Sequence, residues 1–208
     1  MTKKRRHFLQ AVGLAWACAL MLPSLASAAP TVDVVKIMSF SCPVCRAAEA
    51  QDVAIESAVK AVGGSFVRGP VPVDPAESGA KERVYYAARG VSPAVADTIK
   101  NAIYRGAQDL SIPLGEENQV LVWLQQQLGD MPEKDLTALF EASRGPRGKG
   151  ALSRAATLAV SVGVESLPAY VIVVDGRPVS SVDPTSVPGG SLTRLRDEVI
   201  SKVKTLAK

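Results

Sequence analysis

A strand, a helix and a second strand follow one another early in the chain, and this unit limits the folds open to the sequence. Residues 31–38 are almost continuously Val and Ile and predict a buried strand. Residues 43–62 have apolar positions at helical spacing and end at Gly63 and Gly64, and residues 65–73 alternate as a second strand does. Two strands joined through a helix pair in parallel by a right-handed crossover. We therefore expect an α/β fold.

The rest of the chain is helical before it closes with a hairpin. The helical patterns, separated by short Gly and Pro breaks, cover residues 80–89, 93–107, 116–128, 133–143 and 148–162. Two apolar runs, residues 169–174 and 177–182, flank the turn dipeptide Asp175-Gly176 and predict a β-hairpin. Residues 192–206 predict a closing amphipathic helix. The helical block thus looks inserted into a small α/β unit.

The domain boundaries follow from this arrangement. We expect residues 29–77 to form the first half of the α/β unit, residues 78–147 the helical insertion and residues 148–208 the second half. Residues 144–150 are rich in Arg, Lys and Gly but lack the spacing of a phosphate-binding loop, so we expect a solvated hinge there.

Residues 1–28 have the three parts of an export signal. A basic start precedes an apolar run over residues 11–22, and the small residues Ala26 and Ala28 fit a signal peptidase site. We expect cleavage near Ala28, whether the export route is the general secretory or the twin-arginine one. No later segment has an apolar run long enough to cross a bilayer. The mature chain is therefore expected in an oxidising compartment across the membrane.

The net charge of +4 does not indicate a nucleic-acid partner. Lys3, Lys4, Arg5 and Arg6 supply all of the excess, and without them 20 basic residues face 20 acidic ones. Phosphates would require a clustered basic face, which this balance does not favour.

Loss of the signal leaves two cysteines, Cys42 and Cys45, and no histidine. A structural zinc site generally takes four Cys or His ligands, so a single mature chain cannot build one. Activation of a nucleophile by histidine is excluded for the same reason. What remains is one cysteine pair spaced as Cys-Pro-Val-Cys, and a metal or other cofactor is not expected.

The pair lies between the first strand and the first helix, and this position favours a thiolate. If Pro43 is the first helical residue, Cys42 lies at the cap, where unpaired backbone N–H groups and the helix dipole stabilise an anion. Cys45 comes three residues later on the same face, within reach of a disulfide but directed inward. We therefore expect Cys42 to attack and Cys45 to resolve. Only the reduced form contains the thiolate, so stabilising it makes the disulfide a better oxidant.

Two segments, residues 40–45 (Phe-Ser-Cys-Pro-Val-Cys) and residues 164–169 (Val-Glu-Ser-Leu-Pro-Ala), together with the helical insertion, resemble the DsbA family of thioredoxin-fold oxidoreductases. The resemblance covers nearly the whole mature chain. It implies a thioredoxin fold with an all-helical insertion, with Cys42 and Cys45 as the redox pair. A structural disulfide or half of a metal site is the alternative for a lone Cys-x-x-Cys pair.

The resemblance also implies a role for the segment before the hairpin. Pro168 should be cis and lie against the cysteine pair, whereas most X-Pro bonds are trans. The backbone of Leu167 would then stay free to pair with an extended substrate by strand addition. Phe40, Val44 and Leu167 would offer an apolar lip to unfolded polypeptide, and core packing is the alternative for each of them.

Three residues depart from the family's pattern or compensate for it. Val44 stands where strongly oxidising members have His, and it can neither donate a hydrogen bond nor carry a charge to Cys42, so we predict a weaker oxidant. Lys36 stands six residues before Cys42, where the family often buries a carboxylate; it either snorkels from the strand end or favours the thiolate as a cation. Glu49, one turn beyond Cys45, is a substitute acid or a solvated helix residue.

The resemblance implies a monomeric periplasmic thiol:disulfide oxidoreductase. Only 13 residues, 29–41, precede Cys42 in the mature chain, which leaves no room for the dimerisation domain of a DsbC-like isomerase. We expect an oxidase that passes the Cys42–Cys45 disulfide to reduced, unfolded exported polypeptides and is reoxidised by a membrane redox partner. A reductase supplied by a membrane electron donor is the nearest alternative. A peptide-binding or chaperone module with a structural disulfide is another.

Overall fold

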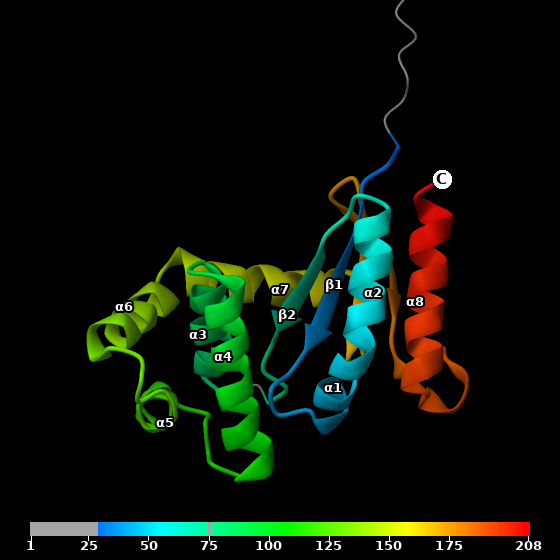
Figure 1. The fold of residues 1–208 in the computed structure, drawn as a ribbon. Helices are drawn as coiled ribbons and strands as arrows, with labels where there is room; N and C mark the ends of the chain where they lie inside the picture. Colours follow the sequence, from blue (N-terminus) through cyan, green and yellow to red (C-terminus); the bar gives the residue numbers. More distant parts are fainter. Residues whose placement is uncertain (1–28, 75) are drawn as a thin grey trace, which may run out of the picture.

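A computed structural model describes residues 29–74 and 76–208 (Figure 1). Four strands form one mixed sheet in the order β2-β1-β3-β4, and they are β1 (Val32–Met38), β2 (Phe66–Pro70), β3 (Ala169–Val174) and β4 (Arg177–Val182). β1 pairs in parallel with β2 and antiparallel with β3, which confirms the predicted crossover and hairpin. The predicted export signal lies outside the described residues.

In the described residues, eight α-helices join and flank these strands. They are α1 (Pro43–Ala47), α2 (Glu49–Ala61), α3 (Ala80–Arg89), α4 (Pro93–Tyr104), α5 (Glu117–Gln127), α6 (Glu133–Arg144), α7 (Ala151–Ser161) and α8 (Leu192–Leu206). π-Helical turns cover Arg105–Asp109 and Pro146–Gly150, and 3₁₀ turns cover Pro184–Ser186 and Pro188–Gly190. Within the described ranges, no helix is long and apolar enough to span a bilayer.

Helices cover both faces of the sheet. α2 and α8 lie side by side on one face (Figure 1), where their apolar stripes bury Val32 and Val34 of β1. The opposite face of β1 carries Ile37, which packs with β3 and with residues of α7. This alternation follows from the period of two along a strand. It places Lys36 on the face that α2 covers.

The insertion, α3 to α6, has its own apolar core beside the β2 edge of the sheet (Figure 1). Val84, Ile99, Trp123 and Phe140 are among its buried side chains. The same cluster continues into the end of β1 and the first turn of α1, where it includes Met38, Phe40 and Cys45. The insertion therefore packs against the cysteine pair.

The structure differs from the sequence prediction in two connections. The helix predicted over residues 43–62 is two helices, because Ala48 has φ −68° and ψ −15° and its carbonyl accepts the N–H of Gln51 at 2.9 Å, a three-residue step. No Gly or Pro marks this break. Residues 144–150, predicted as a solvated hinge, are mostly exposed, but Pro146–Gly150 form a π-helical turn. Gly148 is buried there, and a Cβ on it would lie 1.9 Å from the Ser143 carbonyl oxygen.

Candidate active site

The end of β1 and the start of α1 place the two cysteines in different surroundings. Cys42 is the N-cap of α1, with extended backbone, and Pro43 follows at the first helical position, as predicted. The Cys42 side chain is partly accessible, whereas Cys45 is fully buried. Both thiols are free, and the Cys45 N–H donates a hydrogen bond to Cys42 Sγ at 3.1 Å. This contact gives a Cys42 thiolate a donor at the helix start.

The shared environment moves the pKa values of the two thiols in opposite directions. The hydrogen bond from the Cys45 thiol lowers the pKa of Cys42 from 9.0 to about 6, against a smaller opposing effect of burial, and the backbone N–H groups of Cys45 and Val44 assist. The same thiol–thiol hydrogen bond and burial raise the pKa of Cys45. The pair therefore holds one thiolate, on Cys42, and one proton, on Cys45. This supports the predicted division between attacking and resolving sulfur.

The Leu167-Pro168 peptide bond is cis, which confirms the predicted geometry. Pro168 is buried directly before β3, and Leu167 is partly buried. Cys42 Sγ lies 3.9 Å from the Leu167 carbonyl oxygen, a long contact between residues 125 positions apart that is a hydrogen bond only when the thiol is protonated. The segment before the hairpin thus lies against Cys42.

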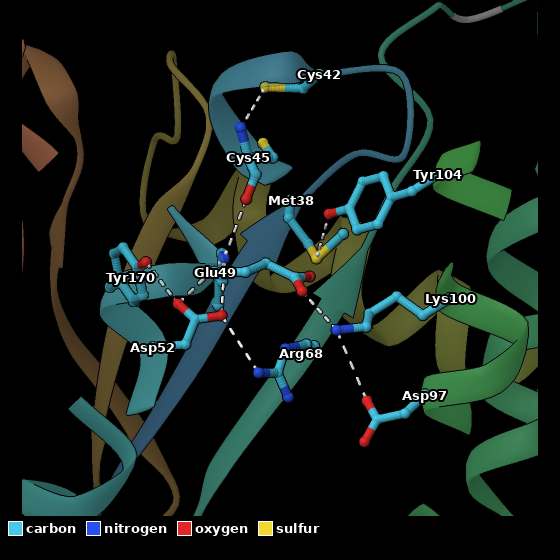
Figure 2. A network of polar contacts seen from close by, with 11 residues as sticks. Met38, Cys42, Cys45, Glu49, Asp52, Arg68, Asp97, Lys100, Tyr104 and Tyr170 are labelled. Carbon is cyan, nitrogen blue, oxygen red and sulfur yellow. Dashed lines mark hydrogen bonds and ion pairs between the residues drawn. The ribbon is translucent and has the colours of Figure 1, made fainter. Parts of the chain in front are cut away.

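A buried polar network lies beneath Cys45 (Figure 2). Lys36 has no exposed surface, and its Nζ donates to the two Asp52 carboxylate oxygens at 2.8 and 3.1 Å and to the Cys45 carbonyl oxygen at 3.2 Å. The Tyr170 hydroxyl donates to Asp52 at 2.8 Å, and the Arg68 guanidinium lies 3.3 Å from the same carboxylate. Two cations thus share one carboxylate under the redox pair.

The network decides between the interpretations offered for the two charged residues near the site. Of the two offered for Lys36, the structure supports a buried cation that helps to lower the pKa of Cys42. Lys36 does not snorkel to solvent: it lies on the α2-covered face of β1, and Asp52 supplies the counter-charge for its burial. Burial lowers the pKa of Lys36, and the neighbouring Asp52 carboxylate opposes this shift. Glu49, the predicted substitute acid, forms an ion pair with Lys100 of α4 and has no hydrogen bond to Cys45 in the described part of the chain. The buried acid is Asp52, which the sequence analysis missed.

The structure also corrects the predicted apolar lip. Phe40 is fully buried, with its ring edge-on to Tyr85 at 5.7 Å and to Tyr104 at 5.3 Å between centroids, so it belongs to the core. Val44 is 45% exposed beside Cys42, and Leu167 is partly accessible. The accessible apolar surface next to Cys42 therefore comes from Val44 and Leu167.

Contacts from the helical insertion complete the site. Gln108 Nε2 donates to the carbonyl oxygens of Phe40 at 2.8 Å and of Cys42 at 3.2 Å. On the other side of the loop, Lys81 of α3 donates to the Ser41 hydroxyl at 3.2 Å. Neither residue carried a signal in the sequence, since a polar side chain at the end of a helical pattern predicts a solvated face.

A Cys-x-x-Cys pair at a helix start, facing a cis proline on a four-stranded sheet, defines a thioredoxin fold, here with a helical insertion. No protein-family model matches the chain, and no curated protein sequence does. Solved structures of DsbA do match. A variant of Pseudomonas aeruginosa DsbA has a TM-score of 0.63 at 22% identity, with 84% of this chain and 88% of that chain covered.

Two further structures give the same result. The oxidoreductase DsbA1 of Neisseria meningitidis has a TM-score of 0.59 at 17% identity, over 88% of each chain. Proteus mirabilis DsbA, solved with a non-covalently bound peptide, has a TM-score of 0.61 at 19% identity, over 86% of this chain and 90% of that chain. The predicted DsbA-like fold, a thioredoxin fold with a helical insertion, is confirmed.

Proposed function

We propose that the chain is a periplasmic thiol:disulfide oxidoreductase that oxidises cysteines of reduced, unfolded exported polypeptides. The observation that carries the proposal is the asymmetry of the pair: a partly accessible Cys42 with a lowered pKa and a buried Cys45 within hydrogen-bonding distance. The disulfide of this pair is the only redox group that the reaction requires. The peptide bound to Proteus mirabilis DsbA supports a polypeptide as the substrate.

The exchange proceeds in two steps that involve Cys42 first. A substrate thiolate attacks Cys42 Sγ of the oxidised pair, so that a mixed disulfide forms while Cys45 leaves and takes up a proton. A second substrate thiolate then attacks the substrate sulfur of that mixed disulfide and releases Cys42 as a thiolate. The polypeptide gains a disulfide and loses two electrons, which the cysteine pair accepts.

The hydrogen bonds that lower the pKa of Cys42 favour oxidation of the substrate by this pair. With a pKa of about 6 in place of 9.0, the Cys42 thiolate stabilises the reduced protein at pH 7 by at most about 1.4 kcal/mol, because only the one unit between that pKa and pH 7 counts. That free energy corresponds to at most about 30 mV of added oxidising power. Val44 contributes no polar group to the thiolate. We therefore propose an oxidase weaker than members of the family with His at this position.

The remaining parts of the proposal concern partners. Strand addition along the Leu167 backbone would hold an extended substrate beside Cys42, with Val44 and Leu167 as apolar contacts. A membrane redox partner would reoxidise the pair, and the chain would act as a monomer.

Trapping experiments test the activity. Incubation of Cys45→Ser with a polypeptide that contains an activated disulfide should accumulate a mixed disulfide through Cys42, whereas Cys42→Ser should form none. Absence of the adduct in Cys45→Ser would contradict the proposal. Protection of an unfolded client from aggregation that survives in Cys42→Ser, with no exchange in the wild type, would instead support a binding module.

Equilibration with glutathione buffers tests the direction. An oxidase should have a potential well above that of thioredoxin, which is about −270 mV, and below the roughly −120 mV of the strong oxidant DsbA. A value near that of thioredoxin would support a reductase.

A further inference from the structure

The end of α4 widens into a π-helical turn, Arg105–Asp109, that faces the cysteine loop. The turn is closed by a hydrogen bond from the Leu110 N–H to the Arg105 carbonyl at 3.1 Å, a five-residue step. The indole N–H of Trp123 in α5 donates to the Ala102 carbonyl at 2.8 Å, and Ala102 lies in the last turn of α4, directly before the π-helical turn. The insertion thus builds this turn from its own residues.

Gly106 permits the close approach of the indole ring. A Cβ at this position would lie 2.6 Å from Trp123 Nε1, so no larger residue fits there without a shift of the ring. π-Helical turns are rare and occur frequently at functional sites. Here the turn brings two consecutive polar side chains, Gln108 and Asp109, to the redox pair.

These two side chains bind both sides of Cys42. The amide nitrogen of Gln108 donates hydrogen bonds to the Phe40 carbonyl (2.8 Å), two residues before the cysteine, and to the Cys42 carbonyl (3.2 Å). The Asp109 carboxylate accepts hydrogen bonds from both terminal guanidinium nitrogens of Arg46, which follows Cys45 in α1. The Arg46 guanidinium also lies 5.6 Å from the centre of the Tyr104 ring. The backbone of the loop and the side chain of α1 are therefore fixed from the same turn.

The carbonyl and the sulfur of Cys42 both accept hydrogen bonds from backbone N–H groups of α1. The carbonyl accepts the Arg46 N–H at 3.3 Å, the first helical bond of α1, while Sγ accepts the Cys45 N–H at 3.1 Å. Without Gln108 the carbonyl keeps only the 3.3 Å bond from the Arg46 N–H, so the sulfur is held less closely over the Cys45 N–H. Because Gln108 holds the carbonyl without touching the sulfur, its effect on the thiol is indirect.

We propose that Gln108 is a positioning residue through which the helical insertion sets the reactivity of the Cys42 thiol. The inference deepens the proposed function, since it concerns the nucleophile of that same exchange. It assigns the insertion a part in tuning the cysteine pair in addition to any part in binding substrate.

The test is the pH dependence of Cys42 alkylation by iodoacetamide in the reduced protein. Gln108→Met keeps the length of the side chain and removes both N–H donors, so the midpoint should rise by about one pH unit, and the rate near pH 6 should fall severalfold. Gln126→Met is the matched control: Gln126 is exposed on α5 and has no side-chain hydrogen bond in the described residues, and its midpoint should stay at the wild-type value.

Two further variants separate positioning from a general loss of structure. Trp123→Phe keeps an aromatic ring, although a smaller one, and loses the donor to Ala102, and it should raise the midpoint by a smaller amount. Gln108→Leu also removes both N–H donors without adding a charge, and it carries the test with the same expected rise of the midpoint if Gln108→Met does not fold. The free energy of unfolding is measured for each variant, and the order of the alkylation midpoints should not follow the order of these free energies.

A midpoint in a folded Gln108 variant within about 0.2 pH units of the wild type would overturn the inference. That result leaves the proposed function intact as long as the wild-type thiol shows a low midpoint and forms the mixed disulfide. If the wild-type thiol reacts like free cysteine, the proposed function fails first.

Discussion

Replacement of Lys36 by Met should destabilise the fold strongly, although the new side chain is apolar and of similar length. The change leaves the Asp52 carboxylate buried with only the Tyr170 hydroxyl at 2.8 Å and the Arg68 guanidinium at 3.3 Å. Removal of one partner from a buried ion pair costs about 3–5 kcal/mol. Because two of the donors to Asp52 remain, we expect a loss near the lower end, about 3 kcal/mol.

The measurement is urea unfolding of the reduced protein at pH 7, followed by circular dichroism. With a slope of roughly 2 kcal/mol per molar urea for a chain of this size, the midpoint should fall by about 1.5 M. The control is Lys60→Met on the exposed face of α2, where the pair with Glu56 is solvated and its loss should cost less than about 0.5 kcal/mol.

A double variant distinguishes the cost of the unpaired Asp52 charge from the cost of lost packing. Lys36→Met combined with Asp52→Asn removes both charges of the pair, while the amide oxygen can still accept from the Tyr170 hydroxyl and the Arg68 guanidinium. We expect this protein to be more stable than Lys36→Met alone. If Lys36→Met costs less than about 1 kcal/mol, or the double variant is the less stable, the argument from the buried pair is refuted.

The remaining predictions concern four side chains. The rate of Cys42 alkylation should rise with pH with a midpoint of about 6, and a midpoint above about 8 would contradict the lowered pKa of this thiol. Val44→His should lower that midpoint and raise the reduction potential. Phe40→Ala should lower the free energy of unfolding by about 3–5 kcal/mol, and Val44→Ala by less than about 1 kcal/mol, as urea midpoints would measure. Burial raises the pKa of Glu82 from 4.5 to about 7. Its stabilising contribution is therefore fully present below pH 4.5 and is lost as the pH rises through 7. In Glu82→Gln the fall in the free energy of unfolding between pH 5 and 8 should be smaller by about 2 kcal/mol.

Local sequence signals located most of the secondary structure. The runs on either side of Asp175-Gly176 became β3 and β4 with the predicted bounds, and residues 80–89 and 192–206 became α3 and α8. Each of these segments has a clear period or a glycine at its end, which act over a few residues. The break at Ala48 has no such marker.

The cysteine pair could be found from its spacing and its place after a strand, but its surroundings could not. Distance along one helix predicts Glu49 as the acid and gives no signal for Asp52. The break at Ala48 lies before both residues, and the structure pairs Glu49 with Lys100 and Asp52 with Lys36. Lys36 shows the same limit, since its burial depends on a carboxylate 16 residues away. Long-range pairs of this kind leave no local pattern.

The apolar cluster of the insertion crosses the boundaries that the sequence suggests. Cys45, Phe40 and Met38 belong to the first half of the α/β unit by chain position, yet their side chains pack with α3, α4 and α5. Excision of residues 78–147 to leave a minimal thioredoxin-like protein would therefore expose the underside of the resolving cysteine to water. In this chain the helical block and the redox pair form one architectural unit, and neither is a module that can be exchanged without the other.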